Sequence, residues 1–170
     1  MFRAVVMIAA LVLVSDQATK YWVQSTLSAG QTISVVGDLL QLRLVYNPGA
    51  AFSIGSGSTW IFSITAAAAV VGVTVVARRV TSRPWAVALG LVLGGAATHL
   101  LDRLFREPGF ARGHVVDFID YAGFFVGNVA DIALVVGVGL VMVLNLRGIP
   151  LREPIASAGA STTDQVLPSS

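Results

Sequence analysis

The chain has 170 residues, of which 55% are hydrophobic and 12% are charged. Soluble domains carry about 25% charged residues, so the composition excludes an ordinary soluble protein and indicates one small integral membrane domain. In such a protein the net charge of +2 acts as an orientation signal, and no nucleic-acid partner is expected. The sequence contains no cysteine, which excludes disulfides, thiolate nucleophiles and thiolate metal sites.

Four apolar stretches are long enough to cross a membrane. They predict an all-α integral membrane protein with four transmembrane helices, at about residues 4–23, 59–77, 84–101 and 124–146. The first stretch resembles a secretory signal, but the charged residues Asp16 and Lys20 inside it favour a retained span.

Residues 31–46, between the first two spans, have a different pattern. A turn signal at Gly37 and Asp38 is followed by an alternation of Leu40, Leu42, Leu44 and Tyr46 with Gln41, Arg43 and Val45. This pattern predicts a small β-hairpin or cradle outside the membrane.

Basic residues gather at one end of the four-span arrangement, and most acidic residues gather at the other. The basic end contains Arg3, Arg78, Arg79, Arg83, Arg147 and Arg152. Because cytoplasmic loops are enriched in Lys and Arg, we expect this end and both chain termini in the cytoplasm, with the hairpin extracytoplasmic. Residues 1–150 are predicted to form the membrane domain, and residues 151–170, rich in Ala, Ser, Thr and Pro, a disordered cytoplasmic tail.

Ionisable side chains inside the predicted spans require an explanation, because each costs at least about 2.5–3.5 kcal/mol to insert. Asp16 and Asp131 lie at a similar depth, about 9–10 Å below the outer ends of their spans at about 1.5 Å per residue. Asp16 can form an intrahelical ion pair with Lys20, four residues later. Asp131 has no cation within four positions, so it is the stronger functional candidate.

Other polar residues near the same layer have structural as well as functional interpretations. Asp102 and Arg103 could form an ion pair at the membrane interface, and Asn128 could join two helices by hydrogen bonds. The two histidines, with Asp102 and Asp117, offer ligands for a hard metal ion. Their spacing matches no recognised metal motif, so neither a metal nor another cofactor is expected.

A second carboxylate beside Asp131 would give the pair a chemical function. Two carboxylates in a site of low dielectric constant share one proton, so one is a base and the other an acid. Such a pair can deprotonate a water for attack on a peptide carbonyl and then protonate the leaving amine. The segment before the fourth span, expected to be a loop, supplies the candidates, and spacing alone leaves Asp117 and Asp120 open as the partner.

Five segments between about residues 10 and 146 occur together in an order that resembles the lipoprotein signal peptidases (signal peptidase II), a family of aspartic peptidases. These segments are DQATK (16–20), NPGAAFS (47–53), GGAATHLLDR (94–103), VDF (116–118) and NVAD (128–131). The resemblance implies that Asp117 and Asp131 are the catalytic pair. The residues expected to bind substrate or to order the site are Asp16, Lys20, Asn47, Gly49, His99, Asp102, Arg103 and Asn128.

The resemblance also implies the substrate and the location. Members of the family cleave prolipoproteins just before a lipobox cysteine that already carries a diacylglyceryl group. We therefore expect a multi-pass protein of the bacterial inner membrane, with membrane lipid as a partner, an active site on the extracytoplasmic side and a monomeric state. The family usually has an asparagine at the position of His99, and we expect His99 to replace it functionally, since each ring nitrogen can form one hydrogen bond.

Two other classes of function remain as alternatives. A proton-coupled transporter also places carboxylates in helices, but its site is expected near the membrane midplane between repeated segments, and the sequence has no internal repeat. A non-enzymatic membrane scaffold explains the glycines of the third span, but it does not explain two carboxylates and two asparagines in one layer.

Overall fold

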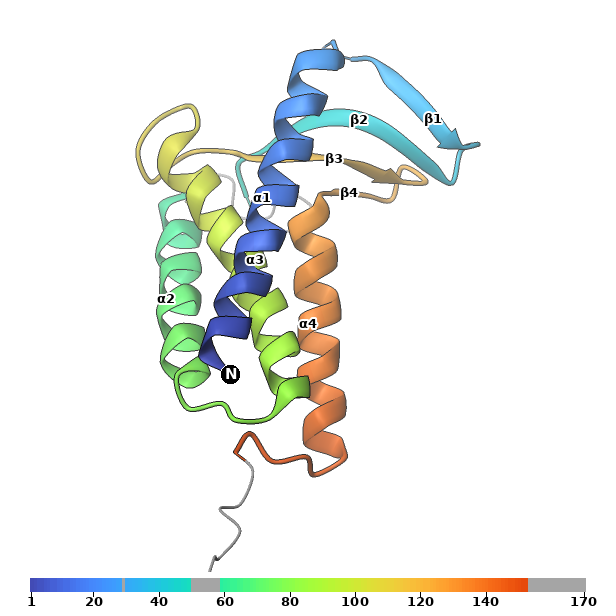
Figure 1. Ribbon diagram of the computed structural model, residues 1–170. Helices are drawn as coiled ribbons and strands as arrows, with labels where there is room; N and C mark the ends of the chain where they lie inside the picture. Colours follow the sequence, from blue (N-terminus) through green and yellow to red (C-terminus); the bar gives the residue numbers. More distant parts are fainter. Residues whose placement is uncertain (29, 50–58, 153–170) are drawn as a thin grey trace, which may run out of the picture.

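The structure, a computed structural model, describes residues 1–28, 30–49 and 59–152. Four helices form a bundle, and each is long and apolar enough to cross a membrane. They are α1 (Phe2–Thr26), α2 (Thr59–Ala77), α3 (Arg83–Phe105) and α4 (Val129–Leu146) (Figure 1). Together with a small antiparallel sheet at one end, the bundle confirms the predicted fold class.

The central helix is α3, which packs against each of the other three helices. Glycines make these contacts close. A Cβ atom added to Gly94 would lie 2.6 Å from the Cβ of Val12 on α1, and one added to Gly95 would lie 2.5 Å from the Cγ of Leu134 on α4. At Gly94 and Gly95, α3 therefore approaches α1 and α4 to a distance that only glycine allows.

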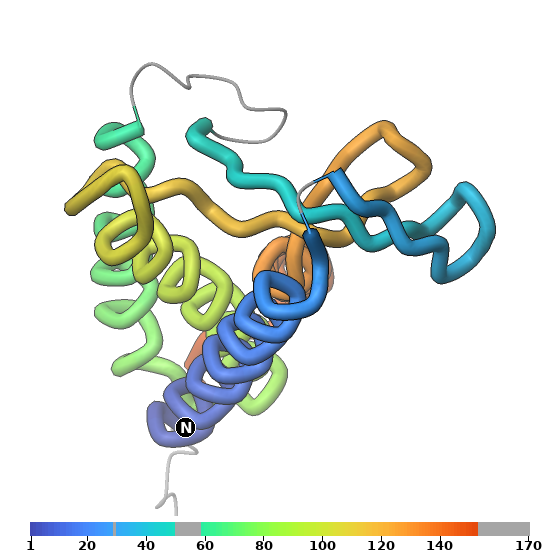
Figure 2. Tube along the Cα trace, turned by 90° about the horizontal axis from the view of Figure 1, so that it is seen from above, coloured from blue at the N-terminus to red at the C-terminus, as the bar shows by residue number. Residues whose placement is uncertain are grey.

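Four antiparallel strands cross the end of the bundle in the order β1-β2-β3-β4. The predicted hairpin is present as β1 (Thr32–Val36) and β2 (Leu40–Asn47), and β3 (Val115–Tyr121) and β4 (Phe125–Gly127) extend it. Figure 2 shows the strands running across the helices, with the β1–β2 turn reaching beyond the bundle.

Apolar packing fixes the sheet to the first helix. Val23 and Leu27, at the end of α1, form a buried cluster with Phe118 of β3. Because side chains alternate along a strand, Asp117, next to Phe118, faces away from this cluster. The sheet thus presents Asp117 toward the space above α3 and α4.

The structure corrects two sequence expectations. The fourth span, expected from residue 124, begins as a helix at Val129, because residues 125–127 pair with β3 and Asn128 caps the helix. Hydropathy alone does not separate a short apolar strand from the start of a span. The segment around Asp117, expected to be a loop, is strand β3.

The other end of the bundle holds the start of α1, the α2–α3 connection and the end of α4 (Figure 1). After α4 the chain returns to this connection, where the backbone N–H of Thr81 donates to the carbonyl of Leu151 at 3.2 Å. The predicted tail lies outside the described residues from position 153 onward.

Candidate active site

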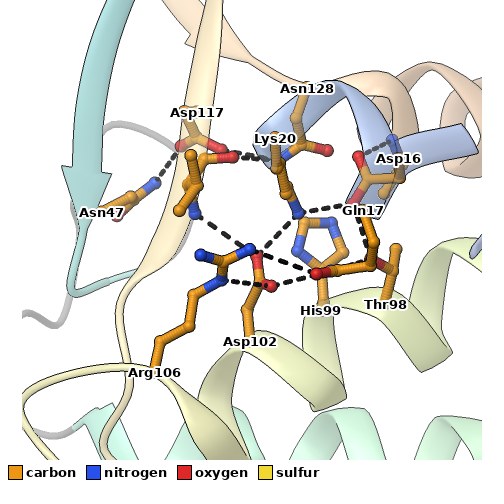
Figure 3. A network of polar contacts seen from close by, with 12 residues as sticks. Asp16, Gln17, Lys20, Asn47, Thr98, His99, Asp102, Arg106, Asp117 and Asn128 are labelled. Carbon is orange, nitrogen blue, oxygen red and sulfur yellow. Dashed lines mark hydrogen bonds and ion pairs between the residues drawn. The ribbon is translucent and has the colours of Figure 1, made fainter. Parts of the chain in front are cut away.

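A buried ion network joins α1 to α3 (Figure 3). The Nζ atom of Lys20 lies 2.6 Å from Asp16 and 2.7 Å from Asp102, and all three side chains are 0% exposed. Arg106 donates from Nε to Asp102 at 2.7 Å. The expected pair of Asp16 with Lys20 is therefore present, whereas Asp102 pairs with Lys20 and Arg106 rather than with its neighbour Arg103.

Two further side chains complete the network, and sequence reasoning missed both. Gln17 donates to Thr98 and to Asp102, each at 2.8 Å. Thr98 in turn donates its hydroxyl to Asp16 at 2.6 Å. Among the described residues, no buried side-chain nitrogen or oxygen lacks a hydrogen-bond partner, so the charges inside the bundle are fully compensated. Sequence reasoning also missed Arg106. Its position four residues after Asp102 was the signal in the sequence that could have identified this ion pair.

The network also contacts the backbone beside each of the two predicted catalytic residues. Asp16 accepts a hydrogen bond of 3.0 Å from the N–H of Ala130, directly before Asp131. Asp102 accepts one of 3.3 Å from the N–H of Val116, directly before Asp117. The ion network therefore determines where β3 and α4 begin relative to α1 and α3.

Asp117 lies on β3 and is 3% exposed. Two amide side chains donate to it, Asn47 at 3.0 Å and Asn128 at 2.6 Å. Burial raises the pKa of the Asp117 carboxyl to about 6, the hydrogen bond from Asn47 opposes this shift, and the negative charge of Asp131 adds to it. Asp117 thus holds a proton at a higher pH than an exposed aspartate does.

Asp131 lies in the first turn of α4, where it forms a capping box with Asn128. Its Oδ2 atom accepts from the backbone N–H of Asn128 at 2.9 Å, and the Asn128 side chain accepts from the Asp131 N–H at 3.0 Å. The other oxygen, Oδ1, lies 3.1 Å from Nε2 of His99. Asn128 therefore bonds to both carboxylates, with its side chain to Asp117 and with its backbone to Asp131.

Arg103 secures the segment that follows β2. Its guanidinium donates to the carbonyls of Asn47, Pro48, Gly49 and Gly113 and lies 5.6 Å from the ring centre of Phe62. Asn47 also accepts from the N–H of Gly49 at 2.9 Å. Arg103 and Asn47 thus fix the described part of the NPGAAFS segment, whose residues 50–53 lie outside the described structure.

These groups surround one cavity of about 210 Å³ at the junction of helices and sheet. Both predicted catalytic aspartates line it, together with Asn47, Gly49, Phe62, His99, Arg103, Val115 and Phe125. Sequence reasoning did not identify Phe62, Val115 or Phe125, because apolar residues in or beside membrane spans carry no distinguishing signal. Lys20, Asp16, Asp102 and Asn128 do not line the cavity, and their network bonds to residues beside it.

Asp120, the alternative partner for Asp131, belongs to a different contact. It lies three positions after Asp117 on β3 and therefore faces the opposite side of the sheet. There it pairs with Arg43 at 3.0 Å and accepts from the N–H of Gly123 at 2.7 Å. Asp120 does not line the cavity.

The four residues considered as metal ligands are not brought together. His114 lines a second cavity beside Arg106 and Glu107, and Asp102 is enclosed by the ion network. Within the part of the chain that the structure describes, no group of three His, Asp or Glu side chains is placed to hold a metal ion.

The sequence of this chain is similar to those of known proteins over most of its length. The family model described as signal peptidase (SPase) II matches residues 8–147. A lipoprotein signal peptidase of Leifsonia xyli subsp. xyli is 50% identical over 159 residues, covering 91% of this chain and 74% of the relative. A lipoprotein signal peptidase of Rhodococcus jostii is 46% identical over 142 residues, covering 84% of this chain and 72% of the relative.

A solved structure described as a bacterial membrane enzyme at 2.3 Å resolution superimposes with a TM-score of 0.75 at 30% identity, covering 84% of this chain and 87% of that one. Sequence and fold therefore agree over most of the chain. The chain belongs to the signal peptidase II family, the membrane aspartic proteases that remove the signal peptides of prolipoproteins.

Proposed function

We propose that Asp117 and Asp131 are the catalytic pair of this peptidase. The observation that carries the proposal is that both carboxylates line one cavity while Asn128 bonds to both. A pair held in this way can share one proton, because two negative charges in a site of low dielectric constant are unfavourable. No nucleophilic side chain is required.

In the proposed reaction a water molecule occupies the cavity between the pair and the peptide bond. The ionised carboxylate takes a proton from this water as its oxygen attacks the carbonyl carbon. The protonated carboxyl then gives its proton to the nitrogen of the leaving amine as the peptide bond breaks. Each molecule in liquid water occupies about 30 Å³. A cavity of about 210 Å³ therefore holds the attacking water and part of a peptide.

The remaining predicted residues order this site. Arg103, Asn47 and Gly49 hold the segment beside the cavity through carbonyl and amide contacts. Lys20, Asp16 and Asp102 fix the backbone before each aspartate. His99 takes the position that the family usually gives to an asparagine, and it bonds to Asp131 there.

The proposed substrate is a prolipoprotein with a diacylglyceryl group on its lipobox cysteine, and the bond cleaved is the one just before that cysteine. The position of the cavity supports this substrate, because the apolar helices meet the sheet at the two carboxylates. An apolar groove of about 510 Å³ also begins at Asp131 and follows Ile132, Val135 and Val136 along α4. In the proposed arrangement, membrane lipid reaches the pair from the side along this groove.

We further propose that the sheet and the cavity face the extracytoplasmic side of the bacterial inner membrane. Six arginines lie at the end of the bundle opposite the sheet, which the positive-inside rule places in the cytoplasm together with both termini. The protein is proposed to act as a monomer, since one chain supplies both carboxylates and their hydrogen-bond donors.

The direct test uses the purified protein in detergent and a lipobox peptide carrying a diacylglyceryl cysteine. Wild type is expected to cut before that cysteine, and Asp117→Asn and Asp131→Asn are expected to be folded and inactive. Asp120→Asn is the matched control, because it changes a buried aspartate of the same strand that does not line the cavity. Equal cleavage by all four proteins would contradict the proposal.

A further inference from the structure

His99 contacts the oxygen of Asp131 that the helix cap leaves free. The His99 Nε2 atom lies 3.1 Å from Oδ1 of Asp131, whereas Oδ2 already accepts from the backbone of Asn128. The side chains of His99 and Asp131 are 20% and 27% exposed, and both line the cavity that contains Asp117. An imidazole therefore lines the same cavity as the two carboxylates.

Two faces of α3 have separate partners. Thr98 and Asp102, four residues apart, face α1 and bond to its ion network. His99 and Arg103, also four residues apart, face the cavity. Residues at this spacing share one side of a helix, so the ionisable groups of α1 bond to the Thr98/Asp102 stripe of α3, next to the stripe that carries His99.

Among the described residues, few ionisable groups line the cavity with His99. Asp131 approaches from α4, Asp117 from β3, and Arg103 lies one turn along α3. Tyr121 of β3 is a further titratable group beside Asp131, and it is neutral over the pH range of the test. Helix α2, which contributes Phe62 to the cavity, contains no Asp, Glu, Lys, Arg or His between residues 59 and 77. The charge around His99 is therefore set by two carboxylates and one guanidinium, and the guanidinium is bonded to backbone carbonyls.

The chemistry of this contact favours a charged Asp131. When Asp131 is ionised it can only accept a hydrogen bond, and Nε2 of His99 then carries the proton and donates it. A hydrogen bond to the charged form of a carboxylate stabilises that form, and the first turn of a helix also stabilises negative charge. Asp117 has neutral amide donors, is almost completely buried and lies on a strand.

Building on the catalytic pair proposed above, we propose that His99 is a positioning residue that holds Asp131 as the ionised base and leaves the shared proton on Asp117. The raised pKa of Asp117, caused mainly by burial, agrees with this assignment. In the reaction, Asp131 takes the proton of the attacking water, whose oxygen bonds to the carbonyl carbon. Asp117 gives its proton to the amine nitrogen when the C–N bond breaks, so the pair ends with the proton on Asp131.

A measurement without substrate tests the assignment separately from the proposed cleavage activity. The chain has two histidines, and His114 lines a different cavity, so it is an internal control in NMR spectra of protein labelled with ¹⁵N-histidine. The spectra are recorded below the pKa of Asp117. Asp131→Asn is expected to move the Nε2–H signal of His99 upfield, whereas Asp117→Asn leaves this signal nearly unchanged.

The opposite pattern would overturn the assignment. If Asp117→Asn moves the His99 signal as far as Asp131→Asn does, or further, the charge is not localised on Asp131. If neither variant moves the signal, His99 does not donate to the pair. The proposed cleavage activity would be unaffected by either result, because the measurement does not involve a peptide.

The pH dependence of cleavage provides a second readout through two variants of His99. His99→Asn keeps a side-chain N–H donor and is expected to retain kcat/KM within about fivefold of wild type, consistent with the size of one hydrogen bond. His99→Leu removes the donor, and the acidic fall of kcat/KM is then expected to begin at a higher pH. An equal loss at every pH, or equal profiles for the two variants, would show a space-filling role and contradict the inference.

Discussion

Asp16 on the first helix accepts a hydrogen bond of 3.0 Å from the backbone N–H of Ala130, at the start of the fourth. These residues are 114 positions apart in the sequence. Lys20 bonds to the same carboxylate at 2.6 Å and to Asp102 at 2.7 Å. A single buried ammonium thus stabilises the contacts that set the backbone before Asp131.

Replacing Lys20 with methionine is therefore expected to destabilise the protein strongly. The substitution leaves two buried carboxylates without their shared cation, and breaking a buried ion pair by removing one partner costs about 3–5 kcal/mol. Thermal unfolding in detergent should show a much lower Tm. Arg3→Met, an exposed arginine near the start of the same helix, is the control and should unfold close to wild type. Equal Tm values for the two variants would contradict the structural role of Lys20.

Asn128 allows helix capping to be separated from catalysis. Its side chain caps α4 by accepting from the Asp131 N–H, and it also donates to Asp117. Serine caps helices about as well as asparagine, but it lacks the amide group that reaches Asp117. Asn128→Ser is therefore expected to keep the Tm nearly unchanged while kcat falls at least about tenfold, a loss of about 1.4 kcal/mol.

The corresponding alanine variant provides the comparison. Asn128→Ala loses the cap as well, which costs about 1 kcal/mol of stability. The Tm should then fall together with kcat. Wild-type kcat in Asn128→Ser would show that the bond to Asp117 has no part in the reaction.

The pH dependence of cleavage should depend on Asn47. Burial raises the pKa of Asp117 to about 6, and the hydrogen bond from Asn47 lowers it. If Asp117 is the acid, kcat/KM falls as the pH rises through this pKa, because the required proton is lost. Asn47→Ala removes a donor that stabilises the ionised form, so the pKa rises further and the basic fall of kcat/KM moves to a higher pH.

The control for this profile is Gln41→Ala, a change on the same strand at a side chain that bonds to Asp38 rather than to the pair. Its basic limb should coincide with that of wild type. A basic limb that moves to lower pH in Asn47→Ala would contradict the sign of the effect and the assignment of the proton to Asp117.

The sequence predicted contacts within single elements better than contacts between them. The spacing of Asp16 and Lys20 predicted an ion pair that the structure confirms, and the alternating residues after Gly37 predicted the hairpin. Spacing did not choose between Asp117 and Asp120, because that choice depends on strand β3. Once the strand is known, its alternation places the two side chains on opposite faces.

Long-range contacts explain most of the remaining differences between the sequence predictions and the structure. Asp102 was paired in sequence with Arg103, its neighbour, whereas it bonds to Lys20, 82 positions away. The apolar residues 124–127 were assigned to a membrane span, although pairing with β3 makes them a turn and a strand. Hydropathy measures the free energy of transferring a side chain from water to lipid. It does not indicate which strand is available for pairing.

The absence of cysteine from the chain makes the proposed orientation easy to measure. Single variants Ser34→Cys, on β1, and Thr81→Cys, between α2 and α3, place one exposed thiol at each end of the bundle. A membrane-impermeant maleimide added outside intact spheroplasts should label Ser34→Cys and should label Thr81→Cys only after lysis. The reverse labelling pattern would place the cavity on the cytoplasmic side.

The measurement that tests the central claim most directly is a double-mutant cycle on Asp117 and Asp131. Residues that act as one catalytic unit are strongly non-additive, so removing both costs about as much as removing either one. The residual cleavage rate of Asp117→Asn/Asp131→Asn should therefore equal that of the single variants, with all three proteins folded. Rate losses that multiply in the double variant would mean that the two carboxylates contribute independently, and would contradict a catalytic pair.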